Sequence, residues 1–510
     1  MTQSKAQYPR TLRLNAEDNL IIAIDRIAQG TAIGQVTTQV DIPRGHKMSI
    51  RSLQIGDPII KFGQVIGFAG KQAAAGDWLH SHNVTYHEFD RPAEKDISTK
   101  PKIVRDAANI PTFDGFRRAN GDIGTRNYLA ILTSVNCSAT VARLIAQEVN
   151  KLGILEDYPN VDGIIPLVHG TGCAMNSQGE GYEFLKRTQW GYATNPNVGA
   201  ALMIGLGREV FQIGRWKQEY HVVEGDAFRS LAIQEMGGTR KAIEAGLAAV
   251  REILPTLNQA QREPAPASKL VLALQCGGSD GYSGITANPA LGTAADLLVQ
   301  CGGTAILSET PEIYGAEHLL YKRVANADVA KKLKGIISWW EGYTGKNGGT
   351  MDNNPSPGNK LGGLTTILEK SLGAVAKGGS QPLEAVYLYA EQVTQKGFVF
   401  VDTPGYDPVA ATGQVAGGAN VLCFTTGRGS AYRCKPTPSI KLATNSEMYR
   451  HMVEDMDINC GDVLDGVSIE EKGQQIFDEI LAVASGKRTK SEALGYGEAE
   501  YVPWQLGATM

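Results

Sequence analysis

Short apolar runs that end in polar loops recur along most of this chain, and they constrain its fold more than any other feature. One run, NYLAILTSV, leads into a segment with apolar residues at helical spacing, ATVARLIAQEVNKL. Strands that are buried on both faces appear as continuous apolar runs, and their alternation with helices is typical of α/β layers. The pattern therefore predicts an α/β fold with mostly parallel sheets. Four further runs of this kind are KLVLAL, TAILSE, GFVFVD and NVLCFT.

The N-terminal part follows a different pattern. Short β-type runs such as NLIIAID and PIIKFGQVIGFA alternate there with glycine-containing turns, which predicts a small all-β domain over residues 1–87. Residues 88–112 are charged and contain several prolines, as expected of a linker. Two layered α/β domains are expected to follow, over residues 113–262 and 263–510.

Composition excludes several classes of function. The chain has 510 residues and a formal net charge of −4, so it lacks the positive field that would attract nucleic acids or anionic membrane surfaces. No segment resembles a signal peptide or a membrane span. Its seven cysteines are scattered without a CxxC pair, which fits a reducing compartment. We therefore expect a cytoplasmic protein that binds a small molecule, with no nucleic-acid or membrane partner.

One glycine-rich loop is the main candidate for a binding site. In open α/β sheets, ligands bind beyond the carboxyl ends of the strands. The segment QCGGSDGYSGITANP follows the run LVLAL and places Cys276, Ser279, Asp280 and Asn288 among four glycines. Glycine permits close approach to the main chain. This loop is therefore predicted to form one wall of the site.

Other loops that follow apolar runs carry further polar side chains. Arg428 lies between glycines in TTGRGS, which suits a two-pronged grip on a carboxylate, although a solvated loop arginine is the alternative. Acidic residues near strand ends often cap helices instead, and we expect this of Glu312 more than of Asp280. The remaining candidates in such loops are Glu309, Asn359, Lys360, Asp402 and Asp407.

The segment DWLHSHN holds two histidines, His80 and His82. If it is extended, residues two apart project from the same face, and both imidazoles could bind one metal ion. Exposed structural histidines are the alternative. The chain has no phosphate-binding glycine motif, no HExxH and no GxSxG, so nucleotide use and serine-nucleophile hydrolysis are unsupported.

Several long motifs together resemble a known family. IPRGHK, IKFGQVIGFA and HSHN look like the SAF domain, a β-clip-like module that opens altronate and galactarate dehydratases. GDIGTRNY, HGTGC, QCGGSDGYSGITANP, NPSPGNK, TGRGS and MDIN are similar to the catalytic region, in the same order. The chain is thus identified as a member of this sugar-acid dehydratase family. HSHN, SETPEIYGAEHLL and IKLATNSE favour the altronate branch, whereas SVNCSA and YPNVDG lean toward the galactarate branch.

The resemblance implies a hydro-lyase that converts D-altronate to 2-dehydro-3-deoxy-D-gluconate with Fe2+ or Mn2+, and we expect a homo-oligomer such as a dimer. The N-terminal domain is expected to fold back over the catalytic loops, since the linker is long enough. By chemical type and loop position we assign catalytic roles to His169, Lys360 and Asp280, substrate binding to Ser279, Asn288, Asn359, Arg428 and Asp407, and metal binding to His80, His82, Cys173 and Cys276.

Two positions depart from the family pattern. Ala174 stands where the family commonly has glycine, and Arg208 stands where it commonly has cysteine. These departures motivate one alternative, a catalytically impaired relative that only binds sugar acids. Galactarate dehydration is another alternative, which the motifs that lean toward that branch support. A buried structural thiol remains the alternative to metal binding for Cys173 and Cys276.

Overall fold

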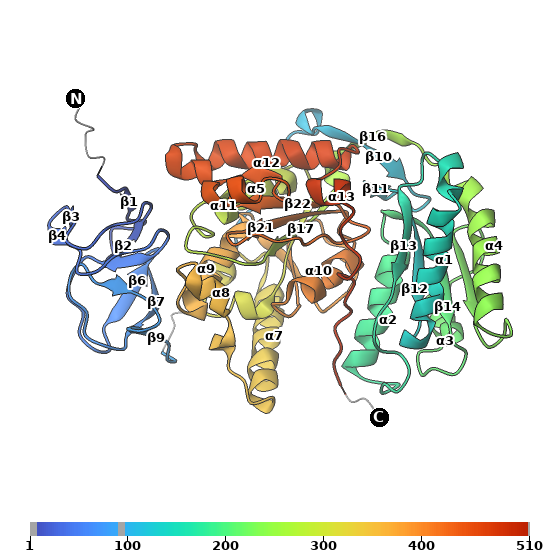
Figure 1. Ribbon diagram of the computed structural model, residues 1–510, viewed down its shortest axis with the longest axis horizontal. Helices are drawn as coiled ribbons and strands as arrows, with labels where there is room; N and C mark the ends of the chain where they lie inside the picture. Colours follow the sequence, from blue (N-terminus) through green and yellow to red (C-terminus); the bar gives the residue numbers. More distant parts are fainter. Residues whose placement is uncertain (1–7, 90–96, 508–510) are drawn as a thin grey trace.

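The computed structural model describes residues 8–89 and 97–507, which form three domains. Figure 1 shows the N-terminal β domain at one end, the second domain at the other, and the C-terminal domain between them. Residues 90–96 of the predicted linker lie outside the described residues. Its later part runs along the C-terminal domain, where Thr99 pairs with Val324 and Arg105 N donates to Gln300 O (2.8 Å).

The N-terminal domain is built from short antiparallel strands, as predicted from its alternating pattern. Its strands contribute buried aliphatic side chains such as Ile22, Ile59 and Ile66 to a shared core. The strands form sheets in the orders β1-β2-β5-β8, β3-β4 and β6-β7-β9. Their bounds are Thr11–Leu12 (β1), Leu20–Ala23 (β2), Ala32–Ile33 (β3), Val36–Thr37 (β4), Lys47–Ser49 (β5), Pro58–Lys61 (β6), Gln64–Ala69 (β7), Trp78–Leu79 (β8) and Val84–Thr85 (β9).

The second domain has a parallel sheet of four strands in the order β13-β12-β14-β15. Strands β12, β13 and β14 are almost entirely apolar, whereas β15 at the edge of the sheet carries Arg229 and Ser230. Val141, Ile145 and Val149 bury one stripe of the first helix. The strands are Tyr128–Thr133 (β12), Gly163–Leu167 (β13), Val198–Gly205 (β14) and Phe228–Ala232 (β15). The helices are Ala139–Lys151 (α1), Glu180–Ala193 (α2), Ile213–Glu219 (α3) and Thr239–Leu257 (α4).

The C-terminal domain contains a parallel sheet of seven strands in the order β19-β20-β18-β17-β21-β22-β23. Its strands are Val271–Cys276 (β17), Thr304–Leu307 (β18), Leu383–Tyr387 (β19), Gly397–Val401 (β20), Val421–Thr426 (β21), Ser439–Ala443 (β22) and Ile458–Asn459 (β23). The α/β fold with mostly parallel sheets is thus confirmed.

Helices cover both faces of this sheet, with α5 and α12 on one side and α7 and α10 on the other (Figure 1). The helices are Ala287–Gln300 (α5), His318–Tyr321 (α6), Ala327–Lys346 (α7), Pro357–Leu361 (α8), Ile367–Val375 (α9), Asp407–Ala416 (α10), Ser446–His451 (α11), Ile469–Ala484 (α12) and Lys490–Ala493 (α13). No helix in residues 8–89 or 97–507 is both long and apolar enough to span a bilayer.

A small antiparallel sheet joins the second and C-terminal domains. It has the order β11-β10-β16 and consists of Thr112–Arg117 (β10), Ile123–Gly124 (β11) and Arg262–Pro266 (β16). The sequence does not predict this sheet, because its strands lie at the ends of proline-containing segments that read as linkers.

Candidate active site

The predicted polar loops of the C-terminal domain meet at the carboxyl edge of the seven-stranded sheet. Cys276 ends β17, Glu309 follows β18 and Asp402 follows β20, and these strands are parallel neighbours. Parallel strands bring their carboxyl ends to one edge, so the loops converge there.

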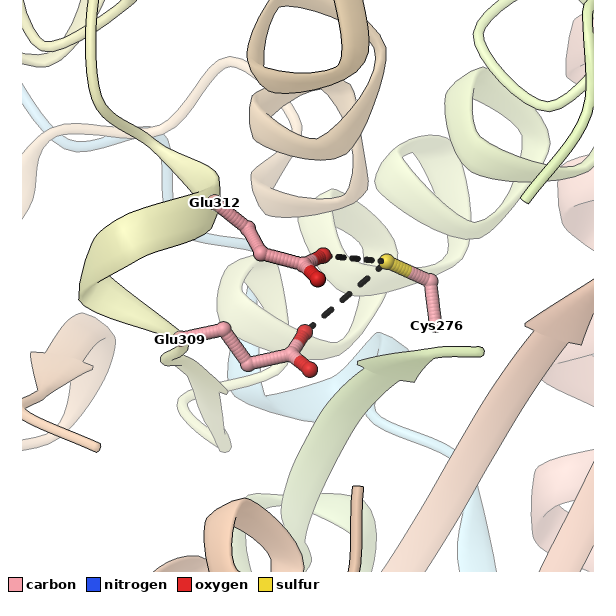
Figure 2. Close-up of side chains that lie close together, drawn as sticks. All are labelled: Cys276, Glu309 and Glu312. Carbon is pink, nitrogen blue, oxygen red and sulfur yellow. Dashed lines mark hydrogen bonds between the residues drawn. The ribbon is translucent and has the colours of Figure 1, made fainter. Parts of the chain in front are cut away.

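Three buried side chains form a compact group at this edge, as Figure 2 shows. Cys276 Sγ lies 3.4 Å from Glu312 Oε2 and 3.8 Å from Glu309 Oε2. One potential ligand atom from each residue lies within 4.8 Å of the others. The expected helix cap at Glu312 is wrong, because its carboxylate turns into this group and accepts from Asn354 Nδ2 (2.9 Å).

Glu309 is held in an unusual backbone conformation. Its φ is +68°, in the left-handed region that residues other than glycine seldom occupy. The hydroxyl of Thr403 accepts from Glu309 N at 2.9 Å. Strained residues of this kind are concentrated at functional sites, so this backbone supports a functional role for the carboxylate.

Two buried lysines neutralise the acidic group. Lys377 Nζ lies 2.7 Å from Cys276 Sγ and 3.1 Å from Glu309 Oε2, and Lys370 Nζ donates to Glu312 Oε1 at 2.7 Å. Burial lowers the pKa of Lys377, but the neighbouring thiol and carboxylates outweigh that effect and raise it. Both ammonium groups therefore stay charged and supply positive charge inside the site.

The carboxyl groups of the site respond differently to this environment. Burial, and then the charge of Glu312, raises the pKa of Glu309 to about 8. Burial also raises the pKa of Glu312, but Lys370 and Lys377 more than offset it, so the pKa is lowered overall. Burial, followed by repulsion from Glu312, raises the pKa of Asp407 to about 7. A carboxyl group that titrates near neutrality can both take and give a proton.

Asp407 lies directly beside the glycine-rich loop. A Cβ atom at Gly277 would lie 2.3 Å from Asp407 Oδ2, so only glycine permits this approach. Asp407 is the first residue of α10, where free backbone N–H groups favour a carboxylate. The structure thus places this predicted residue next to Cys276.

Asp280 holds several loops of the site together. Its buried carboxylate accepts from Thr444 Oγ1 (2.9 and 3.0 Å), Asn445 Nδ2 (3.1 Å) and Ser283 Oγ (3.1 Å). Burial raises its pKa, an effect that these donors oppose. A Cβ atom at Gly427 would lie 2.1 Å from the carboxyl carbon. The geometry favours a positioning role for Asp280 over direct proton transfer.

The predicted amides and Ser279 extend this network toward the lysines. Asn359 Nδ2 donates to Ser279 O (2.9 Å), and Asn359 Oδ1 accepts from Lys370 Nζ (3.3 Å). Asn288 donates to Gly373 O (3.0 Å) and accepts from Thr425 Oγ1 (2.6 Å), so both ends of its amide are engaged. These residues connect the Asp280 network to the thiol–carboxylate group.

Arg428 lies at the open side of these loops. It is exposed, and its side chain packs over Gly278, where a Cβ atom would lie 3.2 Å from Arg428 Cβ. An exposed guanidinium beside the glycine-rich loop can meet an incoming anion, as its predicted role requires.

The N-terminal domain contacts this region through its histidines. His80 Nε2 lies 2.7 Å from Lys360 O, and His46 Nε2 lies 3.3 Å from Leu361 O. A Cβ atom at Gly281 would lie 2.0 Å from Gly45 O, which shows how closely the two backbones meet. The expected approach of this domain to the catalytic loops is therefore observed.

The extended form of HSHN, on which a metal site shared by His80 and His82 was conditional, is not observed. Residues 80–83 form a turn, in which Asn83 N and Val84 N donate to His80 O (2.9 and 2.8 Å). The Asn83 side chain stabilises this turn by accepting from His80 N. His82 is exposed, and its ring lies tilted against that of Trp78, with the two centroids 5.3 Å apart. The two histidines thus differ in environment.

A buried ion-pair group secures the same interface. Lys47 Nζ donates to Glu369 Oε2 (2.8 Å) and Gly363 O (2.6 Å), and Lys61 Nζ donates to Glu369 Oε1 (2.9 Å). Burial raises the pKa of Glu369, but the two lysines dominate and lower it strongly. The carboxylate is therefore ionised and joins two strands of the N-terminal domain to α9.

Two predicted residues lie in the second domain instead. His169 follows β13, where its Nε2 lies 2.7 Å from Thr133 O and its Nδ1 accepts from Thr171 N (3.3 Å). Burial lowers the pKa of His169 to about 4. Cys173 is half-buried in the following loop. These residues belong to a different sheet edge from Cys276, which the sequence could not distinguish.

All three domains match one family. Residues 9–87 match the altronate/galactarate dehydratase SAF domain, residues 115–258 the D-galactarate dehydratase/altronate hydrolase second domain, and residues 267–509 the D-galactarate/altronate dehydratase C-terminal domain. The chain belongs to the altronate/galactarate dehydratase family.

Several curated proteins of this family are similar over nearly their full length. The chain is 37% identical over 492 residues to galactarate dehydratase (L-threo-forming) of Escherichia coli K12, covering 94% of this chain and 93% of the relative. It is 34% identical over 495 residues to altronate dehydratase of Bacillus subtilis 168 (96% and 97%). It is 32% identical over 491 residues to altronate dehydratase of E. coli K12 (96% and 97%).

The metal that the family resemblance implies can be compared with these side chains. In the described part of the chain, the one group of at least three histidine, cysteine or acidic side chains close enough to share an ion is Cys276, Glu309 and Glu312. Glu309 Oε1 is buried there without a hydrogen-bond partner. Carboxylate ligands suit Mn2+ and Fe2+, and three protein ligands leave room for substrate. The donor set therefore fits a divalent ion, although Lys377 contacts two of its members.

Sequence reasoning missed the charged partners in the segment TTILEKSLGAVAKGG. Glu369, Lys370 and Lys377 lie there in an otherwise apolar helical pattern, and all three are buried. Buried charges are costly unless they are paired, so charged residues on the apolar side of a helix are a signal for an internal network. The same signal applies to Lys47 and Lys61.

Proposed function

We propose that this chain is a sugar-acid hydro-lyase that dehydrates D-altronate to 2-dehydro-3-deoxy-D-gluconate. The observation that supports this most is the buried group of Cys276, Glu309 and Glu312, with Lys370 and Lys377, at the carboxyl edge of the C-terminal sheet. Sequence motifs favour altronate. Galactarate is the second candidate, supported by the 37% identity to a galactarate dehydratase.

The reaction breaks the bond between C2 and its hydrogen and the bond between C3 and its hydroxyl. The proton leaves C2, the 3-hydroxyl leaves as water after protonation, and the resulting enol rearranges to the 2-keto acid. Removal of the C2 proton places a second negative charge beside the carboxylate, and that charge is the main barrier.

Asp407 is the residue to which we assign proton transfer. Its pKa of about 7 lets it take the C2 proton in its ionised form and return a proton to the departing hydroxyl. His169 is a weaker candidate, because both of its ring nitrogens already contact backbone groups. Lys370 would stabilise the negative charge that develops on the substrate carboxylate. Arg428 would bind the same carboxylate from the open side of the loops and so orient the substrate.

Fe2+ or Mn2+ would be held by Cys276, Glu309 and Glu312. When bound, such an ion supplies Lewis-acid stabilisation of the substrate carboxylate and 2-hydroxyl. Lys377 contacts both Cys276 and Glu309, so its ammonium would compete with the ion for these two ligands.

Reconstitution with each ion, followed by a panel of sugar acids, tests this proposal. Formation of 2-keto-3-deoxy acid from altronate, lost on chelation and restored by Fe2+ or Mn2+, is the expected result. A preference for galactarate would select the second candidate. Binding of sugar acids without turnover under all conditions would instead identify an impaired relative, for which Arg208 and Ala174 are the motivation.

A further inference from the structure

A separate cavity of about 260 Å³ lies between the second and C-terminal domains. Tyr128 and Gly163, which begin β12 and β13, line it from the second domain, and Glu492 of α13 lines it from the C-terminal domain. Figure 1 shows α13 on the side of the C-terminal domain that faces the second domain. Because His169 lies at the opposite, carboxyl end of β13, the cavity is on the other edge of that sheet.

The cavity has an excess of positive charge. Four cationic side chains line it, together with two carboxylates. Both carboxylates are already engaged: Glu492 receives a two-pronged bond from Arg126 (2.8 and 2.9 Å), and Asp162 accepts from Asn127 N (2.6 Å). Arg433 also lies 3.8 Å from Glu492 Oε1, and Lys435 pairs with the exposed Glu498, so Arg488 is the lining cation that has no carboxylate partner in the described residues.

These three cations retain unused hydrogen-bond donors. Arg433 is buried, and its Nε has no partner, while its terminal nitrogens donate to Tyr496 O (2.9 Å) and Tyr128 Oη (3.1 Å). In the described ranges, Arg488 has neither a hydrogen bond nor an ion pair, and it is exposed. Lys435 pairs with the exposed Glu498. A buried donor without a partner is uncommon, because leaving it unpaired is costly.

We propose that this cavity binds a small divalent oxyanion, either a phosphate group or a short dicarboxylate, between the second and C-terminal domains. Guanidinium groups match both ligands, since each presents paired oxygens in a plane that an arginine fork can meet. The cavity volume of about 260 Å³ accommodates an anion of this size.

Binding at this position links two domains. Tyr128 belongs to the second domain, while Arg433, Lys435 and Arg488 belong to the C-terminal domain. An anion that contacts both sides stabilises their docked arrangement by its binding free energy. This site is independent of the proposed dehydration, because none of its residues lies in the thiol–carboxylate group.

Isothermal titration of the full chain with inorganic phosphate, and separately with succinate, at constant ionic strength tests the proposal. We expect saturable binding of at least one anion. The anion that binds more tightly shows whether the cavity takes a phosphate group or a short dicarboxylate. Arg488→Gln and Lys435→Gln should each weaken that binding about tenfold, which corresponds to about 1.4 kcal/mol. Arg240→Gln is the matched control, because Arg240 is an exposed arginine on α4, away from the cavity.

Two results would overturn the proposal. One is the absence of saturable binding of either anion to wild-type protein. The other is binding that both variants retain at the affinity of Arg240→Gln, because this would place the anion elsewhere, such as the active site. Turnover of the sugar acid is measured in parallel and should not change in any of the three variants, so loss of the anion site and failure of the proposed dehydration are distinguishable.

Discussion

Lys377 Nζ and Cys276 Sγ lie 2.7 Å apart, and both side chains are almost completely buried. Burial, the larger effect, raises the pKa of the Cys276 thiol, while the ammonium of Lys377 opposes this rise. The thiol therefore stays protonated unless further positive charge enters the site. This pairing distinguishes Cys276 from the other buried cysteines, whose roles can be structural.

Replacing Cys276 by serine should lower kcat by about 100-fold or more, because hydroxyl is a poor substitute for a thiolate ligand. The concentration of Fe2+ or Mn2+ needed for half-maximal activity should rise as well. Steady-state kinetics across a metal titration measures both. Cys301→Ser is the control, since Cys301 is also buried but follows α5 at the other edge of the sheet. Equal losses in the two variants would contradict a specific role for Cys276.

The fold was largely predictable, whereas the site was predictable only in part. Continuous apolar runs specify buried parallel strands, so the loops that follow β17 and β21 could be expected at one edge. The sequence does not show to which of two sheets a strand belongs. His169 and Cys276 were therefore assigned to one site, although the strands that carry them belong to different sheets. The HSHN turn was missed because its side chain–backbone bonds compete with an extended form.

The buried Glu369 should make a large contribution to docking of the N-terminal domain. Glu369→Gln leaves Lys47 and Lys61 buried without a charged partner, which should cost about 3–5 kcal/mol. Denaturant unfolding and limited proteolysis between the domains would measure the loss. Asp465→Asn is the control, because it removes an exposed ion pair with Arg10 across the same domains and should cost about 1 kcal/mol or less. Similar losses of unfolding free energy in Glu369→Gln and Asp465→Asn would contradict the expectation that the buried ion pairs contribute more than the exposed one.

The two histidines of HSHN should have unequal effects. His80→Ala removes the contact between Nε2 and Lys360 O, so it should loosen the loop that carries Asn359 and raise KM and the metal concentration needed for activity. His82→Ala is the matched control, since His82 is exposed, and kinetics should match wild type. A double variant that behaves like wild type in metal titrations and turnover would show that the N-terminal histidines do not support the site.

Asp280 and Arg428 should affect different quantities. Asp280→Asn removes the negative charge that Thr444 and Asn445 hold, so both thermal stability and kcat should fall. Arg428→Gln should leave the melting temperature unchanged, because the side chain is exposed, but it should raise KM by about tenfold if it binds the substrate carboxylate. Unchanged KM in Arg428→Gln would remove this arginine from the binding site.

Neutral, buried His169 should make the protein less stable in mild acid. Its pKa is about 4 in the folded chain and about 6.5 when unfolded, so between these values the unfolded state binds more protons. His169 therefore leaves the free energy of unfolding unchanged above about pH 6.5 and lowers it as the pH drops toward 4, by about 2 kcal/mol at pH 5. His169→Gln should show a smaller difference in urea midpoint between pH 7 and pH 5. His451→Gln, at an exposed histidine, should keep the wild-type difference. If His169→Gln also keeps it, the imidazole is not held neutral by burial.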